Sequence, residues 1–577
     1  MASVWGELKR RNVVRVGIAY AVVSWMLLQI ADIILDNIEA PSWVFQAILL
    51  MLVVGFPVAL IFAWAFELTP EGLKKERDVD RSESITHVTG RKLDFAIIGV
   101  LVIAVGFLLV DKLYLSKGET APDEIVATGS KSIAVLPFVN MSDDANNEYF
   151  SDGISEEILN LLTNVPELRV TSRSSAFSFK GQNLDIPTMA ATLNVAHVLE
   201  GSVRKAGDQL RITAQLIEVV SDTHLWSETY DRELKNVFAI QDEIAAAVVD
   251  ALQITLLGKE PKATETNPEA YALYLQARHF GNRGTAEASQ QAETLLKKAL
   301  EIAPGFAPAW VDLGALHWFQ ASTFGLRPYD EAGELARYAI QQALAVDPQN
   351  GRAYAGLARI EMNYDWDFAL ASQHLQQALA LNPGDAHILR IAARLEQILG
   401  RVDAAIDLFR QSIVLDPLAG HYGLGRNLYQ AHRLEEAADS INMELSLNPG
   451  GVSTQYRLGR VLLAQGDAPA ALAAIKQEHD DGWRLAGLAV IQHALGDAGA
   501  SDAALEELIE RFSADMAYQI ADAHAYRGEI DTAFDWLEQA YENRDSGMIN
   551  LLLDPLLANL HDDLRWEPLL DKMGLPH

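Results

Sequence analysis

The sequence contains no cysteine among its 577 residues. Without a thiolate the chain cannot form disulfides, zinc ribbons or iron–sulfur clusters, and it cannot use a cysteine nucleophile. It also lacks the phosphate-binding G-x-x-x-x-G-K-[ST] loop, the H-E-x-x-H zinc motif and the G-x-S-x-G nucleophile elbow. An enzyme built on one of these motifs is therefore excluded.

Basic residues are scarce. The chain has 46 Lys and Arg residues against 78 Asp and Glu residues, a formal net charge of -32. Residues 1–130 hold 12 of the basic and 15 of the acidic residues, so nearly all the excess negative charge lies beyond them. A large acidic surface repels polyphosphate, so we predict no nucleic-acid partner. The alternative interpretation is that the charge only keeps a long protein in solution.

Three long apolar runs occur near the N-terminus, at residues 13–35, 43–66 and 93–114. At about 1.5 Å per residue, such runs are long enough to cross a hydrocarbon core of about 30 Å. They predict a three-helix transmembrane anchor over residues 1–116 that contacts the lipid bilayer. For the third run, a buried core helix is the alternative. Asp32 and Gln29 fit an interfacial position and Pro57 fits a kink, and a transporter is the alternative class for them.

The orientation of the predicted anchor follows from Lys and Arg bias. Four basic residues precede the first run or begin it and six lie in the loop 67–94, whereas the loop 36–42 has none. This bias predicts a multi-pass protein of the bacterial inner membrane. Its N-terminus is expected in the cytoplasm, and the residues after 116 are expected in the periplasm.

A polar linker at 117–131 is followed by a change of pattern that predicts a small α/β domain over residues 132–258. Ala206-Gly207-Asp208 is a good hairpin turn. The expected strands are 132–138, 168–172, 197–205, 209–219 and 224–231, and the expected helices are 148–162, 187–193 and 238–257.

Several segments of this domain occur in a specific order, namely SIAVLPFVNMS, EYFSDGISEEILNLL, RVTSRSSAFSFKG, VLEGSVRK, LRITAQLIE and HLWSETYDR. In this order they resemble the N-terminal domain of the TolB family, which in bacteria is often joined to a helical-repeat array. The resemblance implies an extracytoplasmic domain that engages other proteins and has no catalytic residues. The β-propeller of TolB itself is missing here, so a TolB-type role is not implied.

A repeat begins near residue 267. Asn/Asp-Pro or Ala-Pro steps end successive segments at Pro304, Pro348, Pro383, Pro417 and Pro449, with gaps of 44, 35, 34 and 32 residues. A period near 34 with Ala-Leu before the proline is typical of tetratricopeptide (TPR) repeats. We therefore predict an all-α TPR solenoid over residues 267–545, with about eight helix pairs and an insertion near 322–330. Residues 546–577 are expected to cap its last apolar face.

A TPR array offers a groove for a peptide or helix of a protein partner. The candidate groove residues are Tyr354, Arg390, Tyr422, Asn427 and Arg457. Packing aromatics and solvated charges are the alternative for each, and none is assigned as a binding residue.

No catalytic, cofactor-binding or metal-ligating residue is predicted. The acidic pairs Asp143-Asp144 and Glu156-Glu157 are interpreted as a turn and as favourable helix-dipole charge.

The predicted fold class is thus multidomain: three transmembrane α-helices, a small α/β domain similar to the N-terminal domain of TolB, and an all-α TPR solenoid. The predicted function is a non-enzymatic, membrane-anchored scaffold that binds proteins on the periplasmic side. The alternative is a signalling or regulatory receptor, because proteins of this architecture often carry an adenylate cyclase or winged-helix effector. That effector is missing from this chain.

Overall fold

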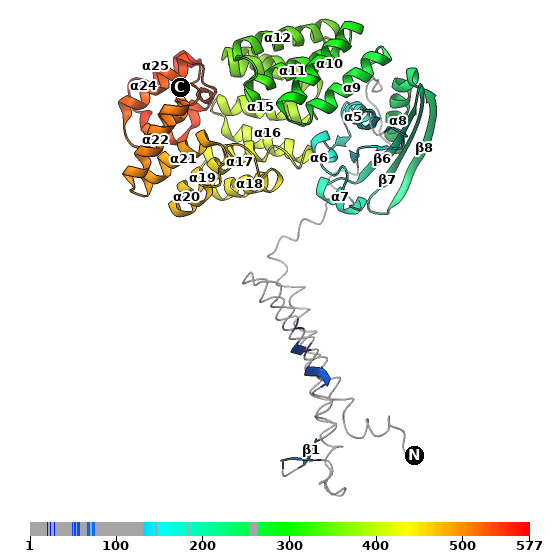
Figure 1. Cartoon of the computed structure of the whole chain (residues 1–577), viewed down its shortest axis with the longest axis horizontal. Coiled ribbons are helices and arrows are strands. Elements are labelled where there is room, and N and C mark those ends of the chain that lie inside the picture. Colours follow the sequence, from blue (N-terminus) through cyan, green and yellow to red (C-terminus); the bar gives the residue numbers. More distant parts are fainter. Residues whose placement is uncertain are drawn as a thin grey trace. The chain divides into compact units, whose positions relative to one another are not determined.

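The computed structural model comprises two compact units, Met1–Val126 and Ala127–His577 (Figure 1). In the second unit the structure describes residues 131–252, except 145, 146, 166 and 183, and residues 264–577. In the first unit it describes positions 20, 24, 28, 49, 51, 52, 55–57, 66–69 and 72–75. The linker 117–130 and residues 253–263, where the helix predicted for 238–257 was expected to end, lie outside the described residues.

The described part of the first unit holds one hairpin. Strands β1 (Phe66–Thr69) and β2 (Gly72–Lys75) pair antiparallel, with Leu68 opposite Leu73. Elsewhere in the unit, the Tyr20 hydroxyl donates a hydrogen bond to the carbonyl of Leu52, at 2.9 Å.

The prediction of a transmembrane anchor is corrected by the structure. In the described part of the chain, no helix has both the length and the apolar character needed to span a bilayer. Its longest α-helices have 18 residues, about 27 Å, and they carry acidic residues such as Asp312 and Glu334. Most residues of the predicted spans 13–35, 43–66 and 93–114 lie outside those described. The hydropathy of the runs alone led to the prediction of three transmembrane helices in an inner-membrane protein, and that prediction is wrong for the described structure.

The second unit opens with an α/β domain around one mixed sheet in the order β5-β3-β6-β7-β8, with β4 pairing β6. Strand β3 runs parallel to β5 and β6, whereas β6, β7 and β8 form an antiparallel meander. The strands are β3 (Ser132–Val135), β4 (Val139–Asn140), β5 (Arg169–Val170), β6 (His197–Ala206), β7 (Gln209–Glu218) and β8 (Thr223–Glu233).

Helices cover both faces of this sheet. Helices α5 (Glu148–Thr163) and α8 (Val237–Ala251) bury one face. Helix α7 (Ile186–Leu193) and Phe179 pack on the other, against Ala134 and Val198. Helix α6 (Arg173–Phe177) follows β5 directly, so it starts where that strand ends. The predicted strands and helices of residues 132–251 thus correspond to real elements, and Gly207 takes the positive φ of +61° that the predicted turn requires.

Residues 264–577 form a helical array made of consecutive antiparallel pairs. In the repeats that end in a proline step, the second helix of the pair ends one or two residues before the proline. Proline cannot donate the backbone hydrogen bond that would continue the helix. The pairs are α9 (Pro268–Gly281) with α10 (Ala286–Ile302), α11 (Ala307–Phe324) with α12 (Tyr329–Val346), α13 (Gly351–Ile360) with α14 (Phe368–Leu381), α15 (Ala386–Ile398) with α16 (Val402–Leu415), α17 (His421–Gln430) with α18 (Leu434–Leu447), α19 (Thr454–Ala464) with α20 (Ala468–Ile475), α21 (Asp481–Ala494) with α22 (Ala498–Phe512), and α23 (Ala517–Tyr526) with α24 (Ile530–Glu542).

The long repeat holds extra residues near 322–330, as predicted. They end α11 and begin α12, which have 18 residues each, with residues 325–328 between the two helices. Gly325, with φ of +59°, ends α11, and Pro328 caps the start of α12. The turn between the two helices is therefore short.

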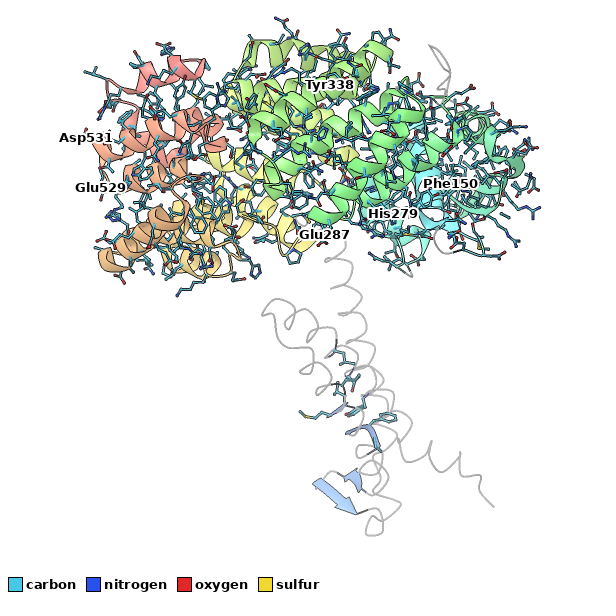
Figure 2. The ribbon with its side chains drawn as sticks, turned by 45° about the horizontal axis from the view of Figure 1, so that its top comes forward. Phe150, His279, Glu287, Tyr338, Glu529 and Asp531 are labelled. Atoms are coloured by element: carbon cyan, nitrogen blue, oxygen red, sulfur yellow. The ribbon has the colours of Figure 1, made fainter. Side chains whose placement is uncertain are left out.

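The α/β domain contacts the array at several places, among them the link between α14 and α15, where Asn382 donates to the Asn164 side chain at 3.0 Å. At the first pair, Gly153 of α5 packs so closely on Leu275 of α9 that an added Cβ would lie 2.5 Å from a leucine methyl group. His279 of α9 lies beside the α5 segment that holds Phe150, 3.7 Å from Asp152 (Figure 2). At the link between α16 and α17, the Ser175 hydroxyl donates to the Asp416 carboxylate at 2.6 Å.

The C-terminal segment folds back on the array. It consists of the 3-10 helices η6 (Ser546–Leu553) and η7 (Pro555–Leu560) and the helix α25 (Trp566–Met573). Trp566 is buried in the same core as α14, α15 and α23, which fits the predicted cap. Asp554, between the two 3-10 helices, forms an ion pair with Arg460 of α19.

Candidate functional site

The first helices of the pairs form one side of the array, which we call the inner face (α11, α13, α15, α17 and α19). The α/β domain and the C-terminal segment both lie against this side. Ser172 and Arg173 share a cleft with α11, α13 and α15, while Asn550 of η6 reaches Arg394 of α15. The inner face is therefore where three parts of the unit meet.

Arginines recur along the inner face at the repeat spacing. Arg394, Arg426 and Arg457 lie on α15, α17 and α19, 32 and 31 residues apart. Because successive repeats stack with the same orientation, one position in each repeat comes to lie beside the same position in the next. We call these three residues the inner arginine cluster.

The contacts of the cluster are to neutral groups. Both Nε and Nη2 of Arg457 donate to the Tyr422 hydroxyl at 3.2 Å, and the guanidinium lies 5.1 Å from the centre of that ring. Arg394 donates to the side-chain oxygen of Asn550 at 3.0 Å and to Gln397. Nε of Arg426 is buried without a hydrogen-bond partner in the described residues. None of the three arginines pairs with a carboxylate in this part of the chain.

The pKa shifts of the cluster follow from burial and from mutual repulsion. Burial, with the charge of Arg457, lowers the pKa of Arg394 to about 10. Burial also lowers the pKa of Arg426, and the charges of Arg394 and Arg457 lower it further. For Tyr422, burial alone would raise the pKa, but Arg457 and the hydrogen bond from Ser453 lower it to about 8. A bound anion would relieve this repulsion.

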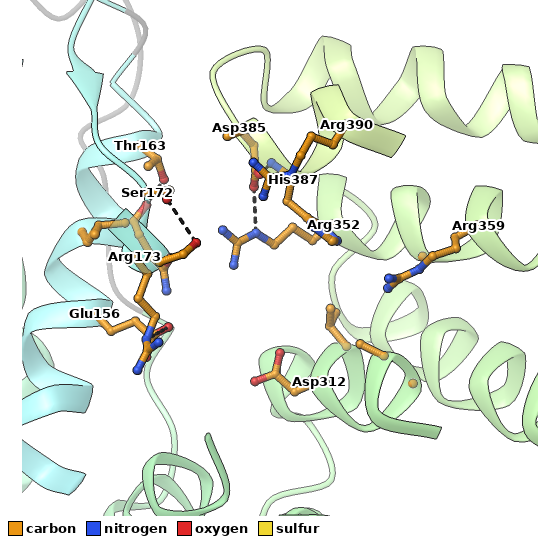
Figure 3. Close-up of a pocket in the computed structure, with 18 of the residues that line it drawn as sticks. Glu156, Thr163, Ser172, Arg173, Asp312, Arg352, Arg359, Asp385, His387 and Arg390 are labelled. Carbon is orange, nitrogen blue, oxygen red and sulfur yellow. Dashed lines mark hydrogen bonds and ion pairs between the residues drawn. The ribbon is translucent and has the colours of Figure 1, made fainter. Parts of the chain in front are cut away.

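A second feature of the inner face is the cleft between α6 and the array, which we call the α6 cleft (Figure 3). Its volume is about 270 Å³. One wall comes from α5 and α6 of the α/β domain, and the other from α11, α13 and α15. Its charged and hydrogen-bonding lining comprises Glu156, Asn160, Thr163, Ser172, Arg173, Ser174, Asp312, Arg352, Arg359, Asp385, His387 and Arg390.

The structure separates the five groove residues named from sequence. Tyr422 and Arg457 lie together in the inner arginine cluster, and Arg390 lines the α6 cleft and pairs with Asp416 at 2.9 Å. Tyr354 donates its hydroxyl to the carbonyl of Pro348, and the buried Asn427 donates its amide nitrogen to the carbonyl of Gly423 within α17, so neither joins the other three.

Sequence reasoning missed Arg394 and Arg426. The signal that would have found them is recurrence, because arginines spaced by one repeat length stack on the same side of a solenoid.

The acidic pair Glu156-Glu157 has a different role from its prediction. These residues lie in the middle of α5, where a helix dipole contributes little. Glu156 binds Arg173 of α6 at 2.9 Å, and Glu157 binds Arg278 of α9 at 2.8 Å. Burial raises the pKa of Glu157 to about 6, although Arg278 opposes this shift. The pair therefore helps to fasten the α/β domain to the array.

No group of three metal-ligating side chains occurs among the described residues. The prediction that the chain has no catalytic, cofactor or metal site stays a prediction.

Family models match two parts of the chain. Residues 129–247 match the second domain of HilA/YgeH-like transcriptional regulators, and residues 367–420 and 422–482 match a tetratricopeptide repeat. The array is therefore a TPR array, as predicted. The likeness of the α/β domain to TolB stays a prediction.

A curated protein and several solved structures are also similar. The "Putative adenylate cyclase 3" of Rhizobium meliloti (strain 1021) is 43% identical over 189 residues, which is 32% of this chain and 32% of that protein. Pseudomonas aeruginosa pilF is 18% identical with a TM-score of 0.30, covering 36% of this chain and 91% of the other. Human IFIT1 is 14% identical with a TM-score of 0.36, covering 54% and 80%. TM-scores this low carry no conclusion about this chain.

The two sequence matches agree with one expectation, namely that relatives of this architecture include proteins named for adenylate cyclase and for transcriptional regulation. The chain spans about a third of the length of the cyclase-named relative.

Proposed function

We propose that this chain is a non-enzymatic interaction scaffold whose inner arginine cluster binds an acidic segment of a partner protein. The observation that carries the proposal is the set of three stacked arginines on α15, α17 and α19 without a carboxylate partner in the described structure. TPR arrays commonly bind peptides or helices on this side. A partner carboxylate would supply the counter-charge that the described residues do not.

The cluster suits the carboxylates of an acidic peptide better than the phosphates of a nucleic acid. Guanidinium groups match carboxylates geometrically and bind them through paired N–H donors. The Tyr422 hydroxyl lies on Arg457, and the side-chain amide of Gln430 lines one pocket together with that arginine, so both add neutral hydrogen-bonding groups nearby. A nucleic acid would have to overcome the net charge of -32 of the whole chain, which disfavours a long polyanion.

The test is binding of a fluorescein-labelled hexaglutamate peptide to the full chain, followed by anisotropy. We expect saturable binding that weakens with added salt. Arg426→Gln and Arg457→Gln should each weaken it at least tenfold, since a charge-assisted contact contributes about 1.5–3 kcal/mol. The matched control is Arg410→Gln, because Arg410 is an exposed arginine of α16 that pairs with Glu436 of α18. Equal affinity in all three variants would contradict the proposal.

A second candidate is a regulatory module of a signalling protein. The match to the cyclase-named relative and the match to a transcriptional-regulator domain favour it. Under this candidate the chain would act on a separate effector, so the purified chain should convert neither ATP nor GTP. Release of a cyclic nucleotide by the purified chain would overturn both candidates.

A further inference from the structure

The α6 cleft is a pocket between the α/β domain and the array, and it is not part of the proposed peptide site. Its floor is apolar and includes an aromatic ring. The residues that form this floor are Leu159, Val170, Val311, Trp318, Ile340 and Ile360. A floor of this kind suits the uncharged body of a small ligand.

Arginines gather at one end of the cleft. Arg352 donates to Asp385 at 2.7 Å, and Arg390 donates to Asp416 at 2.9 Å. In contrast, the guanidinium of Arg359 forms neither a hydrogen bond nor an ion pair with any residue the structure describes, and it points into the cleft (Figure 3). Burial lowers the pKa of Arg359. This arginine is therefore partly desolvated without a counter-charge.

The neighbouring histidine reports the same excess of positive charge. His387 lines the cleft close to Arg359 and Arg390. Burial lowers its pKa to about 3, and the charges of these arginines contribute to the shift. His387 is thus neutral at physiological pH, when it can donate or accept one hydrogen bond with a ligand.

The acidic residues of the cleft do not cancel this charge. Glu156 is held by Arg173 and Arg278, and Asp385 is held by Arg352. Asp312 lies 3.5 Å from Arg278, and burial raises its pKa. Each of these carboxylates therefore already contacts an arginine, with Arg278 shared between Glu156 and Asp312, and none of them pairs with Arg359 in the described structure.

We propose that the α6 cleft binds a small organic anion with a phosphate or carboxylate head group and an apolar or aromatic body. Arg359 binds the head group, with His387 as a neutral hydrogen-bonding neighbour, and the body lies on the floor near Trp318. This ligand is independent of the acidic peptide proposed above, and its body also meets Leu159 and Val170 of the opposite wall. Its binding therefore strengthens the contact between α6 and the array.

The test is isothermal titration of the full chain with four probes. Phenyl phosphate and benzoate carry both a head group and a ring, inorganic phosphate carries only a head group, and benzyl alcohol carries only the ring. We expect phenyl phosphate or benzoate to bind, and the stronger of the two identifies the head group. Inorganic phosphate and benzyl alcohol should bind at least tenfold more weakly.

Two variants separate this site from the peptide site. Arg359→Gln should weaken the best probe at least tenfold and leave hexaglutamate binding unchanged, which also shows that the variant is folded. Arg426→Gln should weaken hexaglutamate binding and leave binding of the best probe unchanged. In the unsubstituted chain, the best probe should slow amide hydrogen exchange at residues 172–174.

Three results would overturn the proposal. The first is that neither ring-bearing anion binds, and the second is that the best probe binds Arg359→Gln as well as the unsubstituted chain. The third is that inorganic phosphate binds as well as phenyl phosphate, since the apolar floor would then have no role.

Discussion

Two arginines of α19, one helical turn apart, have opposite surroundings. Arg460 is buried and forms an ion pair with Asp554 of the C-terminal segment, with Tyr518 also bonded to that carboxylate at 3.3 Å. Arg457 is buried to a similar degree, but its partner is the neutral hydroxyl of Tyr422.

The difference shows how to separate structure from binding on one surface. A buried arginine that the chain neutralises with its own carboxylate fastens two parts of the fold together. A buried arginine that the fold leaves without a carboxylate in the described structure is a group that a ligand can neutralise. Breaking the first kind should cost stability, whereas removing the second kind should cost binding.

The largest effect is expected for Asp554→Ala. The change leaves Arg460 buried without its ion pair and removes the side chain that caps η7 by accepting from the amide of Leu556. Breaking a buried pair by removing one partner typically costs about 3–5 kcal/mol. Urea denaturation followed by circular dichroism measures the loss. The control Asp531→Ala removes an exposed partner of Arg565 and should cost less than about 1 kcal/mol.

For Arg426→Met we expect the free energy of unfolding to change in the opposite direction to that of Asp554→Ala. The substitution replaces a crowded, unpaired guanidinium by an apolar side chain, so the free energy of unfolding should stay the same or rise by about 1 kcal/mol. The hexaglutamate affinity should fall at the same time. A loss of stability as large as that of Asp554→Ala would show that Arg426 is structural.

The third prediction concerns Asp522, a carboxylate of α23 that lies 3.8 Å from Arg460. Both of its oxygens are buried without a hydrogen bond to any described residue. Burial, with the charge of Asp554, raises its pKa. The native state therefore keeps this proton to a higher pH than the unfolded state, and its contribution to stability is lost as the pH rises through the raised native pKa.

Asp522→Asn removes this titration. The free energy of unfolding of the variant, relative to the unsubstituted chain, should increase as the pH is raised from about 4 through neutrality. Urea denaturation at several pH values measures the difference. A difference that stays constant over this range would contradict the raised pKa.

The smallest effect is spectroscopic. The phenol of Tyr422 should ionise near pH 8, which absorbance at about 295 nm detects, and Tyr422→Phe should abolish that transition. Its native pKa lies below the ordinary tyrosine value of about 10, so the stability it contributes is complete above that value and is lost as the pH falls through 8. Arg457→Met should move the transition toward higher pH, and an unmoved transition would show that Arg457 does not set it.

The repeat array and the α/β elements were readable from sequence because local patterns determine them. The proline of each Asn/Asp-Pro step ends a helix, and Gly207 fits the turn between β6 and β7. Trp566 was also placed correctly in the cap, since an array must cover its last apolar face. The long gap between the first two prolines predicts an insertion, but it does not show how the extra residues divide between helix and turn.

The sites were harder to predict from sequence because each brings together residues that are far apart along the chain. The α6 cleft joins Ser172 to Arg359, and nothing in either local segment indicates the other. The wrong transmembrane prediction has a different origin, since hydropathy averages a run of residues without showing where its side chains pack. The ion pairs of Glu156 likewise come from α6 and α9, and a reading of α5 alone could not find them.

Two of the attachments of the α/β domain have a mechanical consequence. Its α5 is fixed to the first helix pair, and Ser175 is fixed to Asp416 more than a hundred residues further along the array. The stretch of array between these two points cannot change its pitch without straining one of the contacts to the α/β domain. A partner that changes the pitch of the array there must therefore strain the hydrogen bond between Ser175 and Asp416. The α/β domain would respond to that strain.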